Sequence, residues 1–206
     1  MHWSWLARPV HRLKARVLVV AGFVLVTTGC LPVASGDDPT RTPGTGTGGF
    51  DTAGLTGDEL PDDTESATVA DVVDGDTIEV TFLPDNRQVD LRLIGINAPE
   101  SVRPNYPVEC YGPEAGTRLA ALLPVGTVVY LERDVSDRDQ FGRLLRHVWI
   151  VDEATDGAFL VSEMLVRGGF VDARVYPPDE RHTQRLADAE RAARDDRVGM
   201  WGGCEG

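Results

Sequence analysis

The sequence predicts a single α+β domain in which five strands form a barrel of the OB type and three helices pack around it. Three observations lead to this fold class. Short segments in the first part of the domain alternate between apolar and polar residues, as half-buried strands do. The spacing then changes to that of an amphipathic helix between the third and the fourth strand, which is the order of elements in an OB barrel. Two more helical segments follow the fifth strand.

The predicted strands are short and rich in valine, isoleucine and leucine. The first three have period-two character, and the turn-forming stretch "LPDNR" joins the second and third as a hairpin. The last two continue the pattern after the first helix. The five ranges are Val69–Val73, Thr77–Phe82, Val89–Ile96, Thr127–Asp134 ("TVVYLERD") and Arg143–Asp152 ("RLLRHVWIVD").

Each predicted helix has an apolar face and a clear end. "ECYGPEAGTRLAALL", residues 109–123, places Ala115, Leu119 and Leu122 on one face and ends at Pro124. "LVSEMLVRGG", residues 160–169, is a short helix that its two glycines stop. "DERHTQRLADAERAARDDRVGMW", residues 179–201, is a longer amphipathic helix that closes at a glycine.

Residues 1–29 have the features of an export signal. Four basic residues precede the apolar run "VLVVAGFVLV", which at about 10–12 residues is shorter than the ~20 needed to span a bilayer. The small residue Gly29 before Cys30 is typical of a bacterial lipoprotein cleavage site, at which Cys30 would be lipidated and become the new N-terminus. The alternative is an ordinary secretory signal cut near this point.

Residues 30–66 are predicted to be a disordered linker, and residues 67–206 the folded domain. The linker is acidic, rich in Gly, Thr and Pro, and has too little apolar surface to offset the entropy of ordering it. The whole chain has a net charge of −13, and most of this excess falls on the domain. Such a charge argues against nucleic-acid binding by bulk electrostatics, so only local clusters of arginine could hold a polyanion.

Cys110 and Cys204 remain in the domain once Cys30 is assigned to the signal. In an exported protein oxidation is expected, and a bridge between them would stabilise the fold by ~4–5 kcal/mol in the chain-entropy model. The alternative is two free thiols. No other Cys or His lies near either cysteine at the spacing of a metal site.

Six polar residues interrupt the strand patterns of the domain and form its candidate site. Carboxylate oxygens suit a hard cation such as calcium, and forked guanidinium groups suit the negative charge of a phosphodiester. An arginine among apolar neighbours in "LRLIGINAPE" would be costly without a partner. The set is therefore suited to metal-assisted phosphoryl transfer, although each motif taken singly has a plain structural explanation. The residues are Asp74, Asp76, Arg92, Asn97, Glu100 and Arg143.

The motifs "VVDGDTIEV", "LRLIGINAPE", "ECYGPEA" and "FGR" occur here in an order and spacing that resemble the staphylococcal (micrococcal) nuclease family. The resemblance covers roughly residues 68 to 201 and includes the closing "GMW". It implies an OB-fold barrel with three helices and a calcium-dependent phosphodiesterase site that acts on DNA or RNA.

The resemblance also implies roles for individual residues. Asp76 matches the first calcium carboxylate, Asn97 stands where the second is usually aspartate, and Ala98 would offer its backbone carbonyl to Ca²⁺. Glu100 matches the general base, and Arg92 and Arg143 match the two phosphate-binding arginines. Because Asn97 lacks a negative charge, calcium is expected to bind more weakly.

Two positions outside this set complete the resemblance. Tyr176 matches one of two tyrosines that stack on the nucleotide, and Arg174 falls at the place of the other, where it could also stack on a base. Asp74, the remaining residue of the candidate site, is expected to order the turn before Asp76 or the groups that surround the ligands.

The resulting hypothesis is a monomeric, exported nuclease, tethered to the membrane by a lipid on Cys30 or else secreted. Absence of an aspartate after Cys30 makes an outer membrane a candidate location. A second hypothesis is a catalytically inactive OB-fold module that binds nucleic acid or a protein at the cell surface. A structural envelope lipoprotein is a third.

Overall fold

The structure is a computed structural model that describes residues 55–204. The predicted signal, Cys30 and most of the predicted linker lie outside these residues. The strands are β1 (Thr64–Val72), β2 (Thr77–Phe82), β3 (Gln88–Leu93), β4 (Ile96–Asn97), β5 (Val128–Glu132), β6 (Leu144–Asp152), β7 (Gly157–Leu160) and β8 (Asp172–Ala173). The helices are α1 (Gly112–Leu122), α2 (Val161–Arg167), α3 (Thr183–Asp195) and the four-residue α4 (Met200–Gly203).

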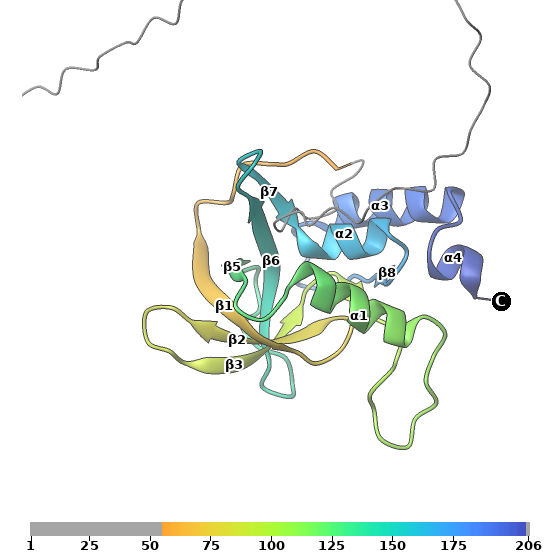
Figure 1. Ribbon diagram of the computed structural model, residues 1–206, viewed down its shortest axis with the longest axis horizontal. Coiled ribbons are helices and arrows are strands. Elements are labelled where there is room, and N and C mark those ends of the chain that lie inside the picture. Colours follow the sequence, from red (N-terminus) through yellow and green to blue (C-terminus); the bar gives the residue numbers. More distant parts are fainter. Residues whose placement is uncertain (1–54, 205–206) are drawn as a thin grey trace, which may run out of the picture. The chain divides into compact units, whose positions relative to one another are not determined.

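Five strands are hydrogen-bonded in a ring, as the OB type requires. The main sheet has the order β3-β2-β1-β5-β6-β7, and all these neighbours pair antiparallel. A parallel pairing between β3 and β6 joins the two sides of the sheet, so that β7 alone extends beyond the ring. With α1 between the third and the fourth strand of the ring, the predicted fold class is confirmed (Figure 1).

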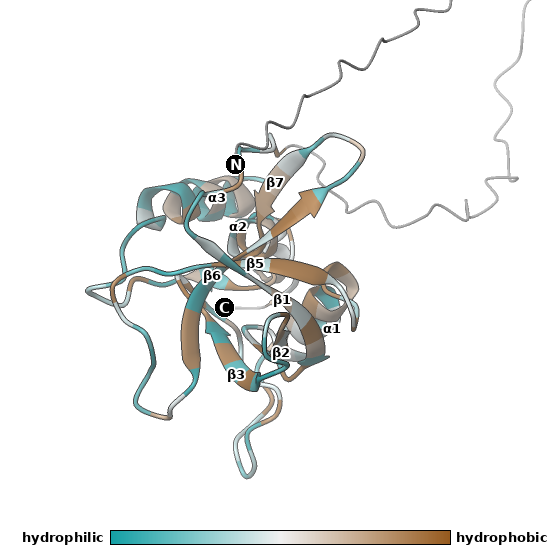
Figure 2. Cartoon of the chain, turned by 90° about the vertical axis from the view of Figure 1, so that its left-hand side faces the viewer, coloured by the Kyte–Doolittle hydropathy of each residue, from teal (hydrophilic) through white to brown (hydrophobic). Residues whose placement is uncertain are grey.

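The core follows from the alternation of apolar residues in the strands. Ile78 and Val80 of β2 and Leu91 and Leu93 of β3 are buried. Figure 1 shows α1, α2 and α3 gathered on one side of the strands. The hydropathy colouring in Figure 2 shows hydrophobic stretches along β3 and β5, whereas α3 is largely hydrophilic. The amphipathic helices therefore cover apolar strand surface with narrow faces, which in α3 consist of Leu186, Ala189 and Ala193.

Three strands were not predicted from the sequence. β4 and β8 contain two residues each and pair with one another, a length at which no periodicity can be recognised. β7 continues directly into the apolar start of α2, so its last residue, Leu160, was included in the predicted helix. It pairs with β6 as a hairpin, from Trp149↔Leu160 to Asp152↔Gly157.

The predicted boundary between linker and domain is wrong by about a dozen residues. β1 begins at Thr64, where it pairs with Glu132 of β5. Asp58 exchanges two backbone hydrogen bonds with Ala158, at 2.9 and 2.8 Å, and Leu55 and Leu60 pack against the core. The composition of this segment is acidic, yet β5 and β7 offer backbone partners that composition does not reveal.

The chain end is joined to the start of α1 by a disulfide between Cys110 and Cys204, whose Cα atoms are 6.0 Å apart. Next to it the ring of Tyr111 packs on Phe170, with the ring centroids 6.0 Å apart. α4 is thereby held against the body of the domain. Within residues 55–204, no helix has the length and apolar character needed to cross a bilayer.

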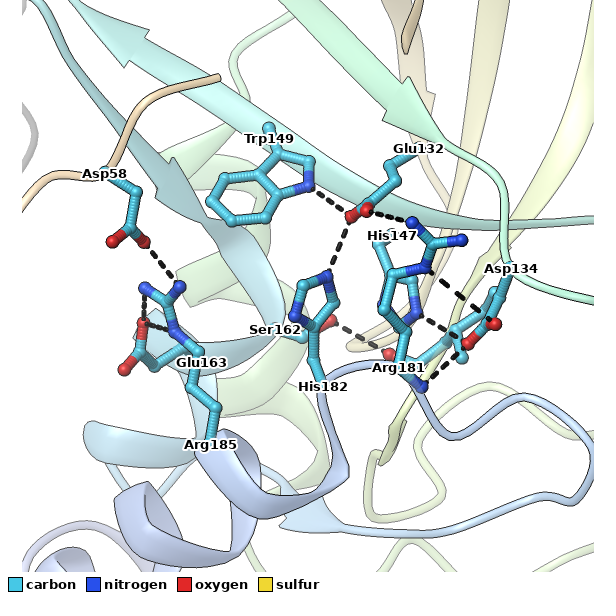
Figure 3. Close-up of polar contacts among 11 residues, drawn as sticks. Asp58, Glu132, Asp134, His147, Trp149, Ser162, Glu163, Arg181, His182 and Arg185 are labelled. Atoms are coloured by element: carbon cyan, nitrogen blue, oxygen red, sulfur yellow. Dashed lines mark hydrogen bonds and ion pairs between the residues drawn. The ribbon is translucent and has the colours of Figure 1, made fainter. Parts of the chain in front are cut away.

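A buried polar cluster fastens the N-terminus of α3 to the barrel (Figure 3). The carboxylate of Glu132 accepts hydrogen bonds from Trp149 Nε1 at 2.9 Å and from Arg181 at 3.1 Å, and it lies 2.8 Å from His182 Nε2. Burial alone would raise the pKa of Glu132, but His182 and Trp149 outweigh it and lower that pKa to about 2. The cluster holds the chain just after the segment that carries Tyr176.

His147 lies at the centre of the same cluster and is only 1% exposed. Its Nε2 lies 3.3 Å from Asp134, and its ring meets that of His182 edge to face, with the centroids 4.5 Å apart. Burial and the neighbouring His182 lower the pKa of His147 to about 4, although Asp134 and Glu132 act in the opposite direction. The native state therefore resists protonation of this imidazole.

Mild acid is expected to destabilise the protein through His147. The unfolded chain takes up a proton near the ordinary pKa of 6.5 and the native state only near 4, so stability is lost as the pH falls between these values. From about pH 7 to pH 4.5 the linkage relation predicts a loss of about 2–3 kcal/mol from this residue. Urea unfolding of the wild type and of His147→Gln at both pH values measures it. Equal losses in the two proteins would contradict the assignment.

Candidate functional site

The turn between β1 and β2 is built from Asp74, Gly75 and Asp76. The side chain of Asp74 accepts the backbone N–H of Asp76 at 3.0 Å, which confirms that Asp74 orders the turn. Burial raises the pKa of Asp74. A Cβ atom on Gly75 would lie 2.7 Å from the side chains of both Ala98 and Ala115, so a glycine is required where the turn passes between β4 and α1.

Asp76 stands at the start of β2 with a carboxylate that three elements hold in place. It is 6% exposed. Oδ1 accepts the hydroxyl of Thr77 at 3.1 Å and also contacts a guanidinium nitrogen of Arg92, and Oδ2 accepts the backbone N–H of Ala98 at 2.8 Å. Pairing of Thr77 with Arg92 across β2 and β3 explains why these groups meet.

The two arginines reach the same place from different strands. Arg92 of β3 donates to the carbonyl of Ile96 at 3.1 Å, and burial lowers its pKa, an effect that nearby Tyr176 opposes and Arg143 reinforces. Arg143, just before β6, donates to the hydroxyl of Thr77 at 3.3 Å. Thr77 thus connects Arg143 with Asp76, and the guanidinium groups form a local positive centre in an acidic protein.

Asp139 fixes the orientation of Arg143 and was not recognised from the sequence. Its carboxylate accepts Nε of Arg143 at 2.7 Å and the backbone N–H of the same residue at 3.0 Å. Burial would raise the pKa of Asp139, but the hydrogen bonds from Arg143 lower it overall. Asp139 is four residues before Arg143 in "DRDQFGR", and this spacing is the signal that could have indicated it.

A cleft of about 410 Å³ opens beside the arginines. Arg92 and Arg143 line it together with Asp139, Tyr176 and Phe141. Phe141 is 76% exposed at its edge, and the motif "FGR" predicted a role only for its arginine. Guanidinium groups beside accessible aromatic rings suit a ligand with a phosphate and a flat ring.

Asn97 ends β4 and lies next to Tyr176 and Asp172. Its Oδ1 is 3.5 Å from the hydroxyl of Tyr176, and its Nδ2 donates to Asp172 at 3.2 Å. The guanidinium of Arg174 donates to the other oxygen of Asp172, also at 3.2 Å. Arg174 is not among the residues that line the cleft, so of the two predicted nucleotide-binding side chains only Tyr176 faces it.

Glu100 lies on the loop after β4 with its carboxylate turned toward its own backbone. It accepts the N–H groups of Val102 and Arg103 at 3.0 and 2.9 Å. The bond from Arg103 is the main cause that lowers the pKa of Glu100, and burial partly opposes it. Among the described residues, no hydrogen bond or ion pair joins Glu100 to Asp76, Arg92 or Arg143. This carboxylate is ionised at neutral pH and is close to the site in sequence.

The predicted metal ligands have the chemistry of a hard cation site. The backbone N–H of Ala98 donates to Asp76 at 2.8 Å, and Asn97 directly precedes Ala98. The groups of this set that could bind a cation are all oxygens, namely the Asp76 carboxylate, the Asn97 amide oxygen and the Ala98 carbonyl. Across residues 55–204 there is no cluster of three or more His, Cys, Asp or Glu side chains arranged for a metal. An oxygen-only set with a single carboxylate fits calcium, which also accepts water or phosphate oxygens as further ligands.

Comparisons with known proteins identify the family of this chain. A family model described as staphylococcal nuclease homologue matches residues 90–203. The thermonuclease of Staphylococcus hyicus is 34% identical over 157 residues, which cover 76% of this chain and 85% of the relative. The thermonuclease of Staphylococcus intermedius is 33% identical over 137 residues, covering 66% and 76%. The SPbeta prophage-derived endonuclease YokF of Bacillus subtilis (strain 168) is 35% identical over 136 residues, covering 65% and 43%.

Proposed function

Because the chain belongs to the staphylococcal nuclease family, we propose that it is a calcium-dependent nuclease that hydrolyses phosphodiester bonds of DNA or RNA. One observation carries the proposal. Two arginines from different strands, Arg92 and Arg143, converge on a cleft beside the buried carboxylate of Asp76. A module that only bound nucleic acid would not need a fixed carboxylate at this place.

The arginines bind the scissile phosphate. Forked guanidinium donors match the oxygens of a phosphate, and donors held in position before reaction cost little reorganisation when negative charge builds up on those oxygens. Asp139 and Thr77 hold Arg143, whereas Asp76 and the carbonyl of Ile96 hold Arg92. Contacts within the free protein therefore hold the guanidinium groups of Arg92 and Arg143 in the orientation that the transition state needs.

Asp76, Asn97 and the backbone carbonyl of Ala98 would hold the calcium ion. When bound, calcium neutralises charge on the phosphate and polarises it toward attack. Thr77 and the backbone of Ala98 keep Asp76 fixed for this purpose. Glu100 would take the proton of the attacking water, whose oxygen bonds to phosphorus while one P–O ester bond breaks and its oxygen leaves with a proton from solvent. The N–H groups of residues 102 and 103 both bond to Oε1 of Glu100, so Oε2 is the atom available to accept that proton.

Tyr176 and Phe141, which both line the cleft, would stack on the nucleotide, which explains why aromatic rings remain accessible beside the arginines. Arg174 is held by Asp172 and would contribute only if that contact opened. Export through residues 1–29, a lipid anchor on Cys30 and a monomeric state are further parts of the proposal. An oxidising location outside the cytoplasm is consistent with the disulfide of this domain.

Replacement of Glu100 by glutamine is expected to lower turnover by ~10²–10⁴, because an amide cannot accept the proton of water. Single-stranded DNA and RNA are incubated with the purified protein while calcium is raised from chelator excess to ~10 mM, the range of weak extracellular sites. Glu114→Gln, the same change on the exposed first turn of α1, is the matched control. Saturable, chelator-sensitive cleavage by the wild type and the control is the expected result.

Cleavage without calcium, or a normal rate in Glu100→Gln, would contradict the proposed chemistry. Binding of labelled DNA without cleavage at any calcium level, by a protein shown to be folded, would instead favour the inactive OB-fold module. Fluorescence anisotropy on the same samples separates these outcomes.

A further inference from the structure

The short sheet of β4 and β8 places Asp172 directly opposite Asn97. The two residues are Cα partners in an antiparallel pair, so their side chains project from the same side of the sheet. There, Nδ2 of Asn97 donates to Oδ1 of Asp172 at 3.2 Å. The partners are 75 positions apart in the sequence, and β8 brings a carboxylate to the edge of the site that no sequence motif indicated.

This contact decides which end of the Asn97 amide faces the site. An asparagine side chain has an oxygen that can bind a cation and an NH₂ group that cannot. Because Asp172 accepts the NH₂ group, Oδ1 is left on the side of the Tyr176 hydroxyl, and the adjoining residue Ala98 bonds to Asp76. The reverse orientation would place two oxygens against each other and is disfavoured.

Asp172 also carries the negative charge that Asn97 lacks. Asp76 already contacts the guanidinium of Arg92, so the ligand oxygens together offer little net charge to a cation. The carboxylate of Asp172 lies one hydrogen bond behind Asn97, and Arg174 holds it there by its second oxygen. Arg174 offsets part of this charge, but its side chain is 54% exposed and water screens it, so the carboxylate of Asp172 still attracts a divalent ion.

We propose that Asp172 is a positioning residue of the calcium site: it orients Asn97 with the oxygen toward the cation and supplies the charge missing at that position. The inference rests on the proposed function, since it concerns the calcium ion of that site. Asp172 acts through Asn97 and does not touch the substrate. Arg174 takes the role of holding Asp172 in place.

Calorimetric titration of calcium into the purified protein tests the proposal without substrate. Asp172→Asn is expected to weaken calcium binding by ~10–100-fold, the usual cost of losing a partner of a metal ligand. The exchange variant Asn97→Asp/Asp172→Asn moves the carboxylate across the same hydrogen bond, and we expect it to bind within ~3-fold of the wild type or more tightly. Asp85→Asn is the matched control, since Asp85 also pairs with an arginine two residues away, at 3.6 Å.

The outcomes separate the inference from the proposed function. A wild type that binds calcium and cleaves DNA, with an unchanged calcium affinity in Asp172→Asn, would overturn the role of Asp172 and leave the nuclease proposal standing. A wild type that binds no calcium would overturn both. Should Asp172→Asn fail to fold, as judged by thermal unfolding without calcium, the exchange variant decides: a folded exchange variant with ~10-fold weaker binding would overturn the inference.

Discussion

Replacement of Arg143 by alanine is expected to reduce cleavage of a phosphodiester substrate by at least ~10²–10³, the usual cost of removing one preorganised donor from developing negative charge. Arg143 is the more informative of the two arginines. Its side chain is 29% exposed and makes its contacts with Asp139 and Thr77 at the edge of the cleft. Its loss should therefore leave the fold intact, whereas loss of Arg92 would leave the buried carboxylate of Asp76 without its ion-pair partner.

Steady-state kinetics at saturating calcium measure the effect. If Arg143 acts chiefly in the transition state, kcat falls more than KM rises. Arg143→Lys should recover only part of the rate, because a lysine cannot donate in a fork to two phosphate oxygens. Arg87→Ala, at the remote turn between β2 and β3, serves as the control for loss of one positive charge. A rate in Arg143→Ala equal to that of the control would remove Arg143 from the site.

The double substitution Cys110→Ser/Cys204→Ser is expected to lower the free energy of unfolding by ~4–5 kcal/mol. The disulfide closes a loop of 94 positions, and opening it restores that conformational freedom to the unfolded chain. It also ties α4 to the loop before α1, so local opening of the C-terminus should become easier. Urea unfolding of the two proteins measures the difference in stability.

A reducing agent supplies the control for the disulfide. It should destabilise the wild type by a similar amount and leave the double variant unchanged, even though Cys30 is present in both. If the reductant also destabilised the double variant, its effect on stability would come from a cysteine chemistry other than the Cys110–Cys204 disulfide. If reduction left the free energy of unfolding of the wild type unchanged, the bond between the two thiols would contribute little to stability.

The strands and helices of this protein could be predicted because each has a local pattern. The alternation in "TIEV" and the helical spacing from Ala115 to Leu122 depend only on neighbours along the chain, and the structure agrees with both. The segment before residue 67 shows the limit of such patterns. Its composition indicates a linker, but backbone hydrogen bonds to β5 and β7 hold it, and those partners lie far away in sequence.

The candidate site also has residues that the sequence could predict and contacts that it could not. Asp76, Arg92 and Arg143 could be selected from the sequence because each interrupts a strand pattern within a motif of the family, and the structure provides partners for all three. Glu100 was selected in the same way, yet its carboxylate is bonded to the backbone of its own loop. A short motif places a residue in the chain but does not orient its side chain.

The sequence by itself determined the fold class, the order of the elements and the groups suited to phosphate chemistry, since these depend on periodicity and residue type. Only the tertiary structure decided which of these groups meet. The pairing of β3 with β6 brings Arg92 near Arg143, and the two-residue pairing of β4 with β8 sets Asp172 against Asn97. The physical reason is that such contacts join residues far apart in the chain through packing and hydrogen bonds, for which adjacent residues carry no signal.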